Sequence, residues 1–267
     1  MGSTRWSTVP QMGRPKSSAP DESPSSASIQ SVERAAALLR LFVPNVPSLG
    51  PTEIAQLSGM SVSTAHRYCS ALRKAGLLRY DPETGRYGLG GGCIELGLAA
   101  AESMPIVGLA RPLMSEVVAH LDRTAVLGVW DEDSVRVIEV NDHTSAPARI
   151  TVRIGAQLGV FETAHGLLYL TFSRRVRQRF AQSPELEGFA ERIETTERER
   201  CAIVRSVAGP RSIPGTTTAA VPVFLGDNIV ASIAIVGPSE GMPTDPDSPL
   251  VSYLKETAAR LSQQLSA

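Results

Sequence analysis

Hydroxyl, imidazole and guanidinium groups recur along one side of the segment 61–74. Ser63, Thr64, His66 and Arg67 share that side, and each carries a group that can reach a phosphate oxygen or the edge of a base. The apolar residues of the segment are spaced close to the i, i+3, i+4 repeat of a helix with one buried side. These predicted buried positions are Val62, Ala65, Tyr68, Cys69 and Leu72. The segment is therefore predicted to be a helix that contacts DNA.

A shorter amphipathic helix is predicted just before it, over 51–57. Gly59 can adopt the positive φ that ends a helix cheaply, and Ser61 is a suitable N-cap for the helix that follows. Two helices joined by a tight turn, the second with a polar outer side, form a helix-turn-helix. We accordingly expect Thr52 and Ser61 to lie at the DNA as well.

The residues after this pair predict a β-hairpin. Strand-like segments at 77–80 and 86–89 flank a turn over 81–85, in which Pro follows Asp and Gly comes last. A hairpin directly behind a recognition helix is a wing, and Arg86 is expected to contact phosphate. Each piece alone also fits a helical pair of another fold with a surface hairpin. Their order favours DNA binding.

Composition limits the remaining function classes. A length of 267 residues leaves room for two domains. The net charge of −1 argues against a general polyanion binder, so DNA binding must depend on local charge. The three cysteines are far apart without metal-ligand spacing, which predicts no metal site and a reducing, cytoplasmic location. No apolar run approaches the ~20 residues that span a bilayer. With neither a nucleophile elbow nor a phosphate-binding loop, we predict no cofactor and no catalytic residue.

The chain divides into four predicted parts. Residues 1–27 are rich in Ser and Pro and are predicted to be a disordered tail. Within the tail, 13–16 resembles a minor-groove AT-hook, although a solvated basic tail is the alternative. The DNA-binding domain follows over 28–90, where Ser28 caps a first helix and Val32 faces inward. A linker helix at 91–104, with a stripe that includes Ile94 and Leu98, leads to an effector-binding domain over 105–267.

The second domain alternates between strand and helix patterns, which predicts an α+β fold with a largely antiparallel sheet. The expected strands are 125–130, 135–140, 148–154, 216–225 and 229–236, and the expected helices are 106–121, 163–172, 186–207 and 248–265. Cys201 falls in the charged segment 186–207, between Arg200 and Arg205. Neighbouring guanidinium groups could lower its pKa, so a redox switch is an alternative to control by a ligand.

The chain resembles bacterial transcription regulators of the IclR type over nearly everything after Ser28. The matching segments are 31–35, 52–55, 63–67, 85–90, 163–166, 214–215, 220–224 and 237–238. The resemblance implies a winged helix-turn-helix, a linker helix and a GAF-like effector domain. It further implies a dimer or tetramer that binds double-stranded operator DNA and responds to a small-molecule effector. An enzyme of the GAF-like domain fused to a DNA module is the rival reading.

The resemblance also implies an effector site. Thr163, Ala164, His165 and Gly166 match a loop whose backbone amides face an organic acid in the family, as helix N-termini face anions. Thr218, Ala234 and Val236 match further pocket positions, the last two standing where members that bind small carboxylates carry serines. An apolar lining favours an aromatic or otherwise apolar ligand. Ordinary core substitution is the alternative at these positions.

Overall fold

The computed structural model describes residues 24–43, 46–143, 145, 150, 152–206, 214–243 and 245–267. The chain forms two compact units, Met1–Leu98 and Ala99–Ala267. Most of the predicted tail, including the segment 13–16, lies outside the described residues. The first helix begins at Pro24 instead of Ser28, so residues 24–27 belong to a helix and not to a disordered tail.

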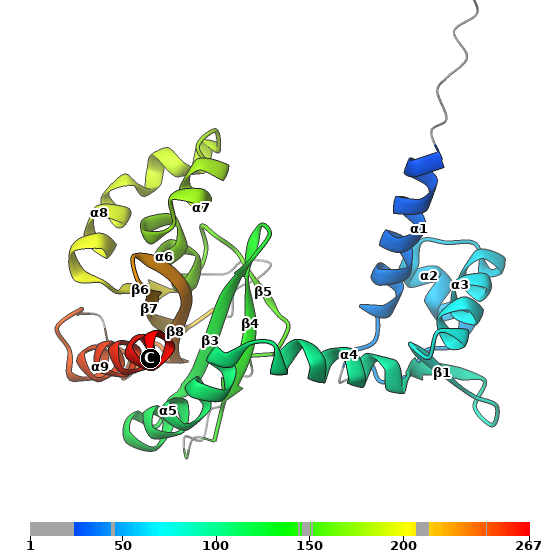
Figure 1. Ribbon diagram of the computed structural model, residues 1–267, viewed down its shortest axis with the longest axis horizontal. Coiled ribbons are helices and arrows are strands. Elements are labelled where there is room, and N and C mark those ends of the chain that lie inside the picture. The colour runs from blue at the N-terminus through cyan, green and yellow to red at the C-terminus, as the bar shows by residue number, and fades with distance from the viewer. Residues whose placement is uncertain are drawn as a thin grey trace, which may run out of the picture. The chain divides into compact units, whose positions relative to one another are not determined.

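Over its described residues before Gly91, the first unit contains three helices and a two-stranded hairpin (Figure 1). These are α1 (Pro24–Leu39), α2 (Pro51–Ser58), α3 (Val62–Lys74), β1 (Leu78–Asp81) and β2 (Arg86–Leu89). Local chemistry fixes their ends, since Gly59 closes α2 at φ +66° and Ser61 Oγ accepts the amide of Thr64 at 3.3 Å. In the hairpin turn, Asp81 accepts hydrogen bonds from the Glu83 amide at 2.9 Å and from the Thr84 hydroxyl at 2.7 Å.

Side chains from one side of each of α1, α2 and α3 form the core of the first unit. Its fully buried side chains include Leu38, Ile54, Ala65 and Cys69. Two positions predicted to be buried are exposed instead: Val32 by 67% and Val62 by 53%. On α1 the inward positions are Leu38 and, just beyond the helix, Phe42, one helical turn apart.

The second unit is built on a six-stranded, fully antiparallel sheet with the order β5-β4-β3-β8-β7-β6. The strands are β3 (Thr124–Asp131), β4 (Ser134–Asn141), β5 (Gln157–Leu158), β6 (Ala202–Arg205), β7 (Thr216–Leu225) and β8 (Asn228–Pro238). This confirms the predicted antiparallel α+β domain. The described residues of the predicted strand 148–154 form no strand, and the short β5 follows them.

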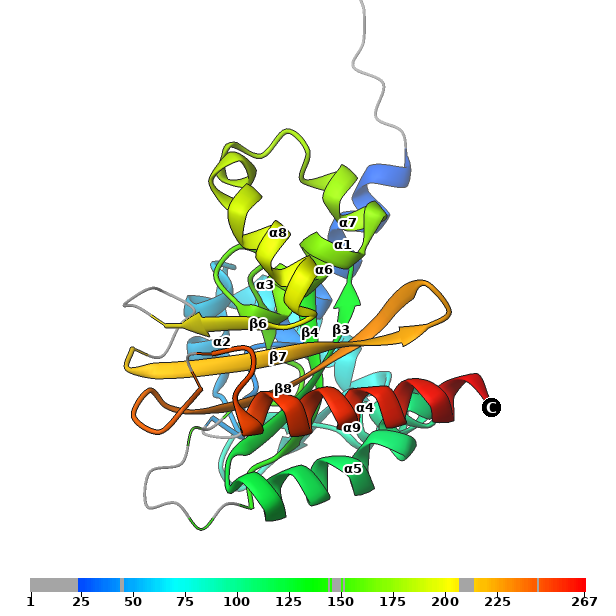
Figure 2. The ribbon, with the colours of Figure 1, turned by 90° about the vertical axis from the view of Figure 1, so that its left-hand side faces the viewer.

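Helices cover both faces of this sheet (Figure 2). On one face lie α5 (Pro105–Leu121) and α9 (Pro249–Ser266), with Leu113, Leu127 and Leu254 in the core between helices and sheet. The other face carries α6 (Ala164–Phe172), α7 (Arg174–Arg179) and α8 (Ala190–Glu199). Small residues such as Ala164 and Ala234 occupy the contact between α6 and the sheet, which allows a close approach.

The charged segment predicted as one helix over 186–207 is three elements. A 3-10 helix at Pro184–Phe189 leads into α8, which ends at Arg200 with φ +51°, and the chain then enters β6. Cys201 therefore lies between α8 and β6, where it is only 4% exposed. Burial raises the pKa of its thiol, contrary to the expected lowering. This environment removes the basis of the redox alternative.

The helix between the two units is α4 (Gly91–Glu102), and the boundary between the units falls inside it. None of its residues is buried, and Ile94, Leu96 and Leu98 are exposed by 66%, 64% and 59%. No single helix in the described segments is long and apolar enough to cross a bilayer, and the one candidate pair, α4 with α5, is bent.

Candidate functional site

Helix α3 presents the predicted DNA-contacting side chains to solvent. Ser63, His66 and Arg67 are exposed and Thr64 is half-buried, whereas Ala65, Cys69 and Leu72 hold the opposite side in the core. Ser61 Oγ also lies 2.8 Å from Thr64 Oγ1 and 3.1 Å from Ser63 Oγ, so three hydroxyls are linked at the start of the helix. The arrangement leaves both hydrogen-bonding groups and positive charge on one exposed surface.

A groove of about 730 Å³ runs between this surface and α1. Arg34 of α1 lines it together with Arg67 and Lys74 of α3. Within the described chain none of these three cations has an ion-pair partner. Uncompensated positive charge along a groove suits a phosphate backbone. Arg34 is not among the predicted DNA contacts, because the pattern of α1 predicts only its buried side.

Arg86 has a different setting from the other predicted DNA contacts. Its Nε donates to Ser48 Oγ at 3.1 Å, and one terminal nitrogen donates to the Ser48 carbonyl at 3.0 Å and pairs with Glu53 at 2.9 Å. Glu53 in turn accepts the Gly50 amide at 2.7 Å, at the start of α2. Arg86 thus ties the hairpin to the helix pair. Thr52, also predicted at the DNA, lies exposed in the first turn of α2.

The predicted effector residues meet at a cavity of about 100 Å³ in the second unit. Thr163, Ala164, His165, Thr218 and Val236 line it. The remaining lining residues are Val126, Ile150, Val152, Leu158, Glu162, Val204, Ser206 and Thr216. Apolar groups dominate, with a cluster of hydroxyls from β7 and the segment after β6. The described lining contains no Lys or Arg.

Two predicted effector residues do not line the cavity. Ala234 is fully buried beneath α6, where it packs with Ala164 and Leu167. At Gly166 a Cβ would overlap the carbonyl oxygens of Gly159 and Val160, so this glycine permits close packing of α6 on the preceding loop. Both residues therefore affect the cavity only indirectly, through the packing of α6 against the sheet and the preceding loop.

The first turn of α6 forms one wall of the cavity. Thr163 Oγ1 accepts the Gly166 amide at 3.0 Å and donates to the Gly159 carbonyl at 2.7 Å, which is a side-chain N-cap. The cap occupies one of the amides predicted to face an organic acid. Those of Ala164 and His165 remain for a ligand, since no hydrogen bond occupies them among the described residues.

His165 is the buried polar side chain of this wall, with 3% of its surface exposed. Its Nδ1 lies 2.7 Å from Ser232 Oγ, and Ser232 Oγ lies 3.3 Å from the Gly128 carbonyl. Burial lowers the pKa of His165 to about 4, so the ring is neutral near pH 7. A Cβ on Gly128 would crowd Val135, His165 and Ser232, which explains a glycine in the middle of β3.

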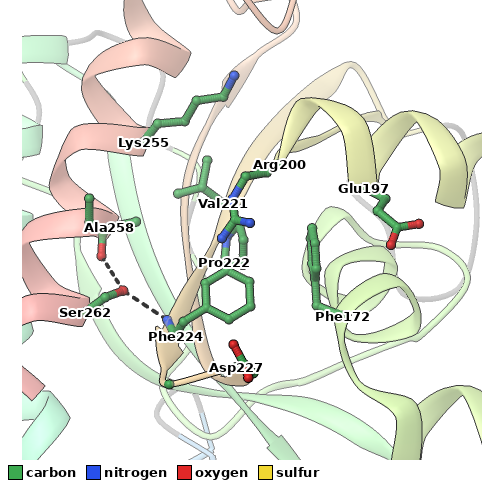
Figure 3. A pocket seen from close by; sticks show the side chains of 12 residues that line it. Phe172, Glu197, Arg200, Val221, Pro222, Phe224, Asp227, Lys255, Ala258 and Ser262 are labelled. Atoms are coloured by element: carbon green, nitrogen blue, oxygen red, sulfur yellow. Dashed lines mark hydrogen bonds between the residues drawn. The ribbon is translucent and has the colours of Figure 1, made fainter. Parts of the chain in front are cut away.

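A second hollow, of about 600 Å³, lies beside β7 (Figure 3). The Arg200 guanidinium stacks 4.7 Å from the Phe224 ring centroid and 5.7 Å from that of Phe172. Beyond the part of β7 that pairs with β6, Pro222 has no N–H to offer and the Phe224 amide donates to Ser262 Oγ at 3.0 Å. Pro222 and the bond from Phe224 to Ser262 thus protect the exposed edge of β7. We assign the hollow a packing role.

Comparison with known proteins decides the family. Residues 31–82 match the IclR helix-turn-helix domain, and residues 98–263 match the bacterial transcriptional regulator IclR C-terminal domain. The chain belongs to the IclR family of bacterial transcriptional regulators. It is therefore a DNA-binding regulator with an effector domain, and its relatives are named as regulators rather than enzymes.

Individual relatives agree with this assignment to the IclR family. The chain is 27% identical to the glycerol operon regulatory protein of Streptomyces griseus, over 90% of this chain and 97% of that protein. It is 33% identical to the regulator XynR of Escherichia coli over 54% of this chain and 57% of that protein. Among solved structures, an IclR regulator from Alicyclobacillus acidocaldarius aligns with TM-score 0.72 and 26% identity, over 89% of this chain and 99% of that one.

A further solved structure shares the fold. An IclR homologue from Microbacterium hydrocarbonoxydans, crystallised with 4-hydroxybenzoate, aligns with TM-score 0.74 and 21% identity, over 88% of this chain and 98% of that one. The two family matches confirm the family predicted from the sequence, and with the solved structures they confirm the fold class. The individual contact residues remain predictions.

Proposed function

We propose that this IclR-family chain binds operator DNA through α3 and the groove beside it, and that occupation of the α6 cavity changes this binding. The observation that carries the DNA interface is the set of three uncompensated cations, Arg34, Arg67 and Lys74, along one groove. Exposed hydroxyls and an imidazole on the same helix supply groups for reading bases. The activity belongs in the cytoplasm, where the operator lies.

The proposed roles of the cations differ. Arg67 lies on the exposed side of α3 and is assigned to a base edge, whereas Arg34 on α1 is assigned to phosphate. Arg67→Ala should weaken operator binding by ~1–3 kcal/mol and change the base preference at one position. Arg34→Ala should weaken all sequences alike and reduce the dependence of affinity on salt by about one phosphate contact.

Fluorescence anisotropy with labelled DNA from the flanks of the chain's own gene tests both assignments. Titrations at several salt concentrations separate a base contact from a phosphate contact. Arg198→Ala, on the exposed surface of α8, is the matched control and should bind as the wild type does. Unchanged affinity in both the Arg67 and Arg34 variants would refute the interface.

We further propose that α4 joins two chains. Ile94, Leu96 and Leu98 expose an unusual amount of apolar surface on one short helix, and burial against a second copy would remove it from water. A pair of chains also places two recognition helices on successive half-sites, roughly 10 base pairs or a multiple apart. A tetramer would be a dimer of such pairs.

The effector is proposed to be a small organic molecule held at the start of α6. An organic acid would place its carboxylate at the amides of Ala164 and His165, and apolar atoms against Val126 and Val236. Thermal-shift measurements on the full chain, followed by anisotropy with and without the stabilising compound, test ligand control. Compounds that raise the melting temperature without changing DNA affinity would contradict it.

A further inference from the structure

The floor of the α6 cavity is one face of the sheet. Val126 of β3 and Val236 of β8 both line the cavity, and Val236 pairs with Thr124, two residues before Val126. Residues two apart in a strand lie on the same face, so the two valines share the face that carries α6. Thr218 pairs with Val236 and extends this floor onto β7.

The floor has no room to move away from a ligand. β3 and β8 are the two central strands of the sheet, and each is paired with a strand on both sides. Leu127 and Ile235, which follow Val126 and precede Val236 in these strands, are fully buried in the core against α5 and α9. A closely packed core leaves no empty space into which the strands could shift.

The opposite wall of the cavity, the first turn of α6, is fixed as well. Thr163 caps the helix, and His165 Nδ1 lies 2.7 Å from Ser232 Oγ of β8. A Cβ on Gly166 would overlap two carbonyl oxygens of the preceding loop, so the helix already touches that loop. The space between floor and wall is therefore bounded by groups that are costly to displace.

A bounded volume of about 100 Å³ limits the size of a ligand. An engineered apolar cavity of about 150 Å³ in another protein holds benzene. In proportion, the α6 cavity has room for about four to six non-hydrogen atoms. The ring of an aromatic acid alone needs more space than the cavity provides, whereas a short aliphatic acid fits.

We propose that Val126 and Val236 limit the effector to aliphatic compounds of about two to four carbon atoms and exclude aromatic rings. The inference rests on the proposed effector cavity. The apolar lining by itself predicts an aromatic or another apolar ligand, and the volume decides between the two. Each methylene group buried up to the limit should strengthen binding about 4-fold, and atoms beyond the limit should weaken it.

Charge is a separate property of this cavity. Glu162 lines it with an exposed side chain, and a carboxylate ligand would meet this like charge as well as the free amides of α6. The size limit comes from the valines, so it should be the same for charged and for neutral ligands. Two series of probes separate the effects: acetate to hexanoate with benzoate, and the corresponding primary amides with benzamide.

Calorimetry on the full-length wild type with both series tests the size limit. Affinity should rise from acetate to propionate or butyrate and fall at hexanoate, with the same order among the amides. Benzoate should bind about 10-fold or more weakly than butyrate, and benzamide than butyramide, because the ring overpacks the cavity. A ring compound that binds as tightly as its butyl counterpart would overturn the proposal.

Val236→Ala tests whether the valines set the limit, because it removes the branching methyl groups from the floor. The ratio of benzoate to butyrate affinity should rise about 10-fold. Val223→Ala is the matched control, since Val223 is fully buried in the core against α5 and α9 and does not line the cavity. Val126→Ala repeats the test at the second valine. A ratio that stays at the wild-type value in both floor variants would overturn the assignment.

Anisotropy with operator DNA separates this inference from the proposed function. Ligands that obey the size limit but leave DNA binding unchanged would contradict ligand control and keep the limit. Ring compounds that bind tightly and change DNA binding would keep ligand control and overturn the limit. If no member of either series binds, the proposed effector cavity is wrong and the size limit falls with it.

Discussion

Burial of a neutral histidine predicts a specific loss of stability in acid. The pKa of His165 is lowered from its ordinary value of 6.5 to about 4, because the charged ring would lose its hydration in the core. Above pH 6.5 the ring is neutral in both the folded and the unfolded chain. Between pH 6.5 and 4 the unfolded chain binds the proton and the folded chain does not. The free energy of unfolding must therefore fall as the pH falls through this window.

The size of this loss follows from the two pKa values. Each pH unit well inside the window corresponds to ~1.4 kcal/mol. The contribution of His165 then reaches about 2 kcal/mol at pH 5 and about 3 kcal/mol at pH 4, relative to pH 7.5. Losses of this size are a large fraction of the ~5–15 kcal/mol that stabilises a typical domain.

Urea unfolding at a series of pH values measures the effect. Trp130 reports on the second unit because its ring packs 5.5 Å from that of Tyr169. The chain has two tryptophans, so a Trp6→Phe background leaves Trp130 as the single indole. His165→Asn lacks an imidazole, and its difference from the wild type cancels the titration of carboxylates. His66→Asn, on the exposed side of α3, is the matched control.

Between pH 7.5 and 5, the wild type should lose about 2 kcal/mol more than His165→Asn. The His66→Asn control should follow the wild type, because the ring of His165 is untouched. Parallel curves for the wild type and His165→Asn would refute the neutral, buried state of this ring. A difference that grows as the pH rises would reverse the sign and refute it equally.

Three further outcomes are expected. Arg86→Ala should lower the free energy of unfolding of the first unit by ~0.5–1 kcal/mol, since its ion pair is partly exposed, and a chemical-denaturation midpoint equal to that of the wild type would contradict its role in joining the hairpin to α2. Ile94→Lys combined with Leu98→Lys should shift the chain toward monomer in analytical ultracentrifugation and weaken operator binding, whereas an intact dimer would exclude α4 from the interface. Gly166→Ala should destabilise the second unit by ~3 kcal/mol or more because its Cβ meets backbone oxygens, and an unchanged melting temperature would contradict that packing.

The helix-turn-helix could be predicted because its signals are local. Gly59 and Ser61 act through their own backbone and the next turn of helix, and the Asp81 turn is closed by residues two and three positions away. Burial could not be predicted from local signals where it depends on whether another element covers the side chain. Val62 fits the apolar repeat of α3, yet no element of the unit covers it, and it stays exposed.

The end of α8 shows a different limit. Charged residues run up to Arg200, and the uncharged residues 201–204 follow them. Arg200 itself adopts a left-handed conformation that favours glycine. The sequence therefore has neither glycine nor proline where the helix ends. Cys201 therefore lies buried just before β6 and not in an exposed helical turn. Burial raises the pKa of its thiol, whereas the neighbouring arginines were expected to lower it.

The effector site was only partly accessible to sequence reasoning. The cap at Thr163 and the start of α6 are local features, and both are present. The partnership of His165 with Ser232 joins residues 67 positions apart, and it depends on the register of β3 against β8, where Gly128 pairs with Ser232. Ser232 lies on the same strand as Ala234 and Val236, but no local pattern marks it as the partner of His165.

The acid sensitivity originates in one buried polar pair. A domain selected for stability alone would gain by replacing His165 and Ser232 with apolar residues of similar volume, because such a core has no donor to satisfy and no proton to exclude. This chain keeps the pair, in which His165 Nδ1 lies 2.7 Å from Ser232 Oγ and Ser232 Oγ lies 3.3 Å from the Gly128 carbonyl. The pair thereby joins the start of α6 to the point where β3 and β8 pair. A buried polar network specifies one arrangement of the core, which gives a physical reason for keeping a pair that makes the fold less stable in acid.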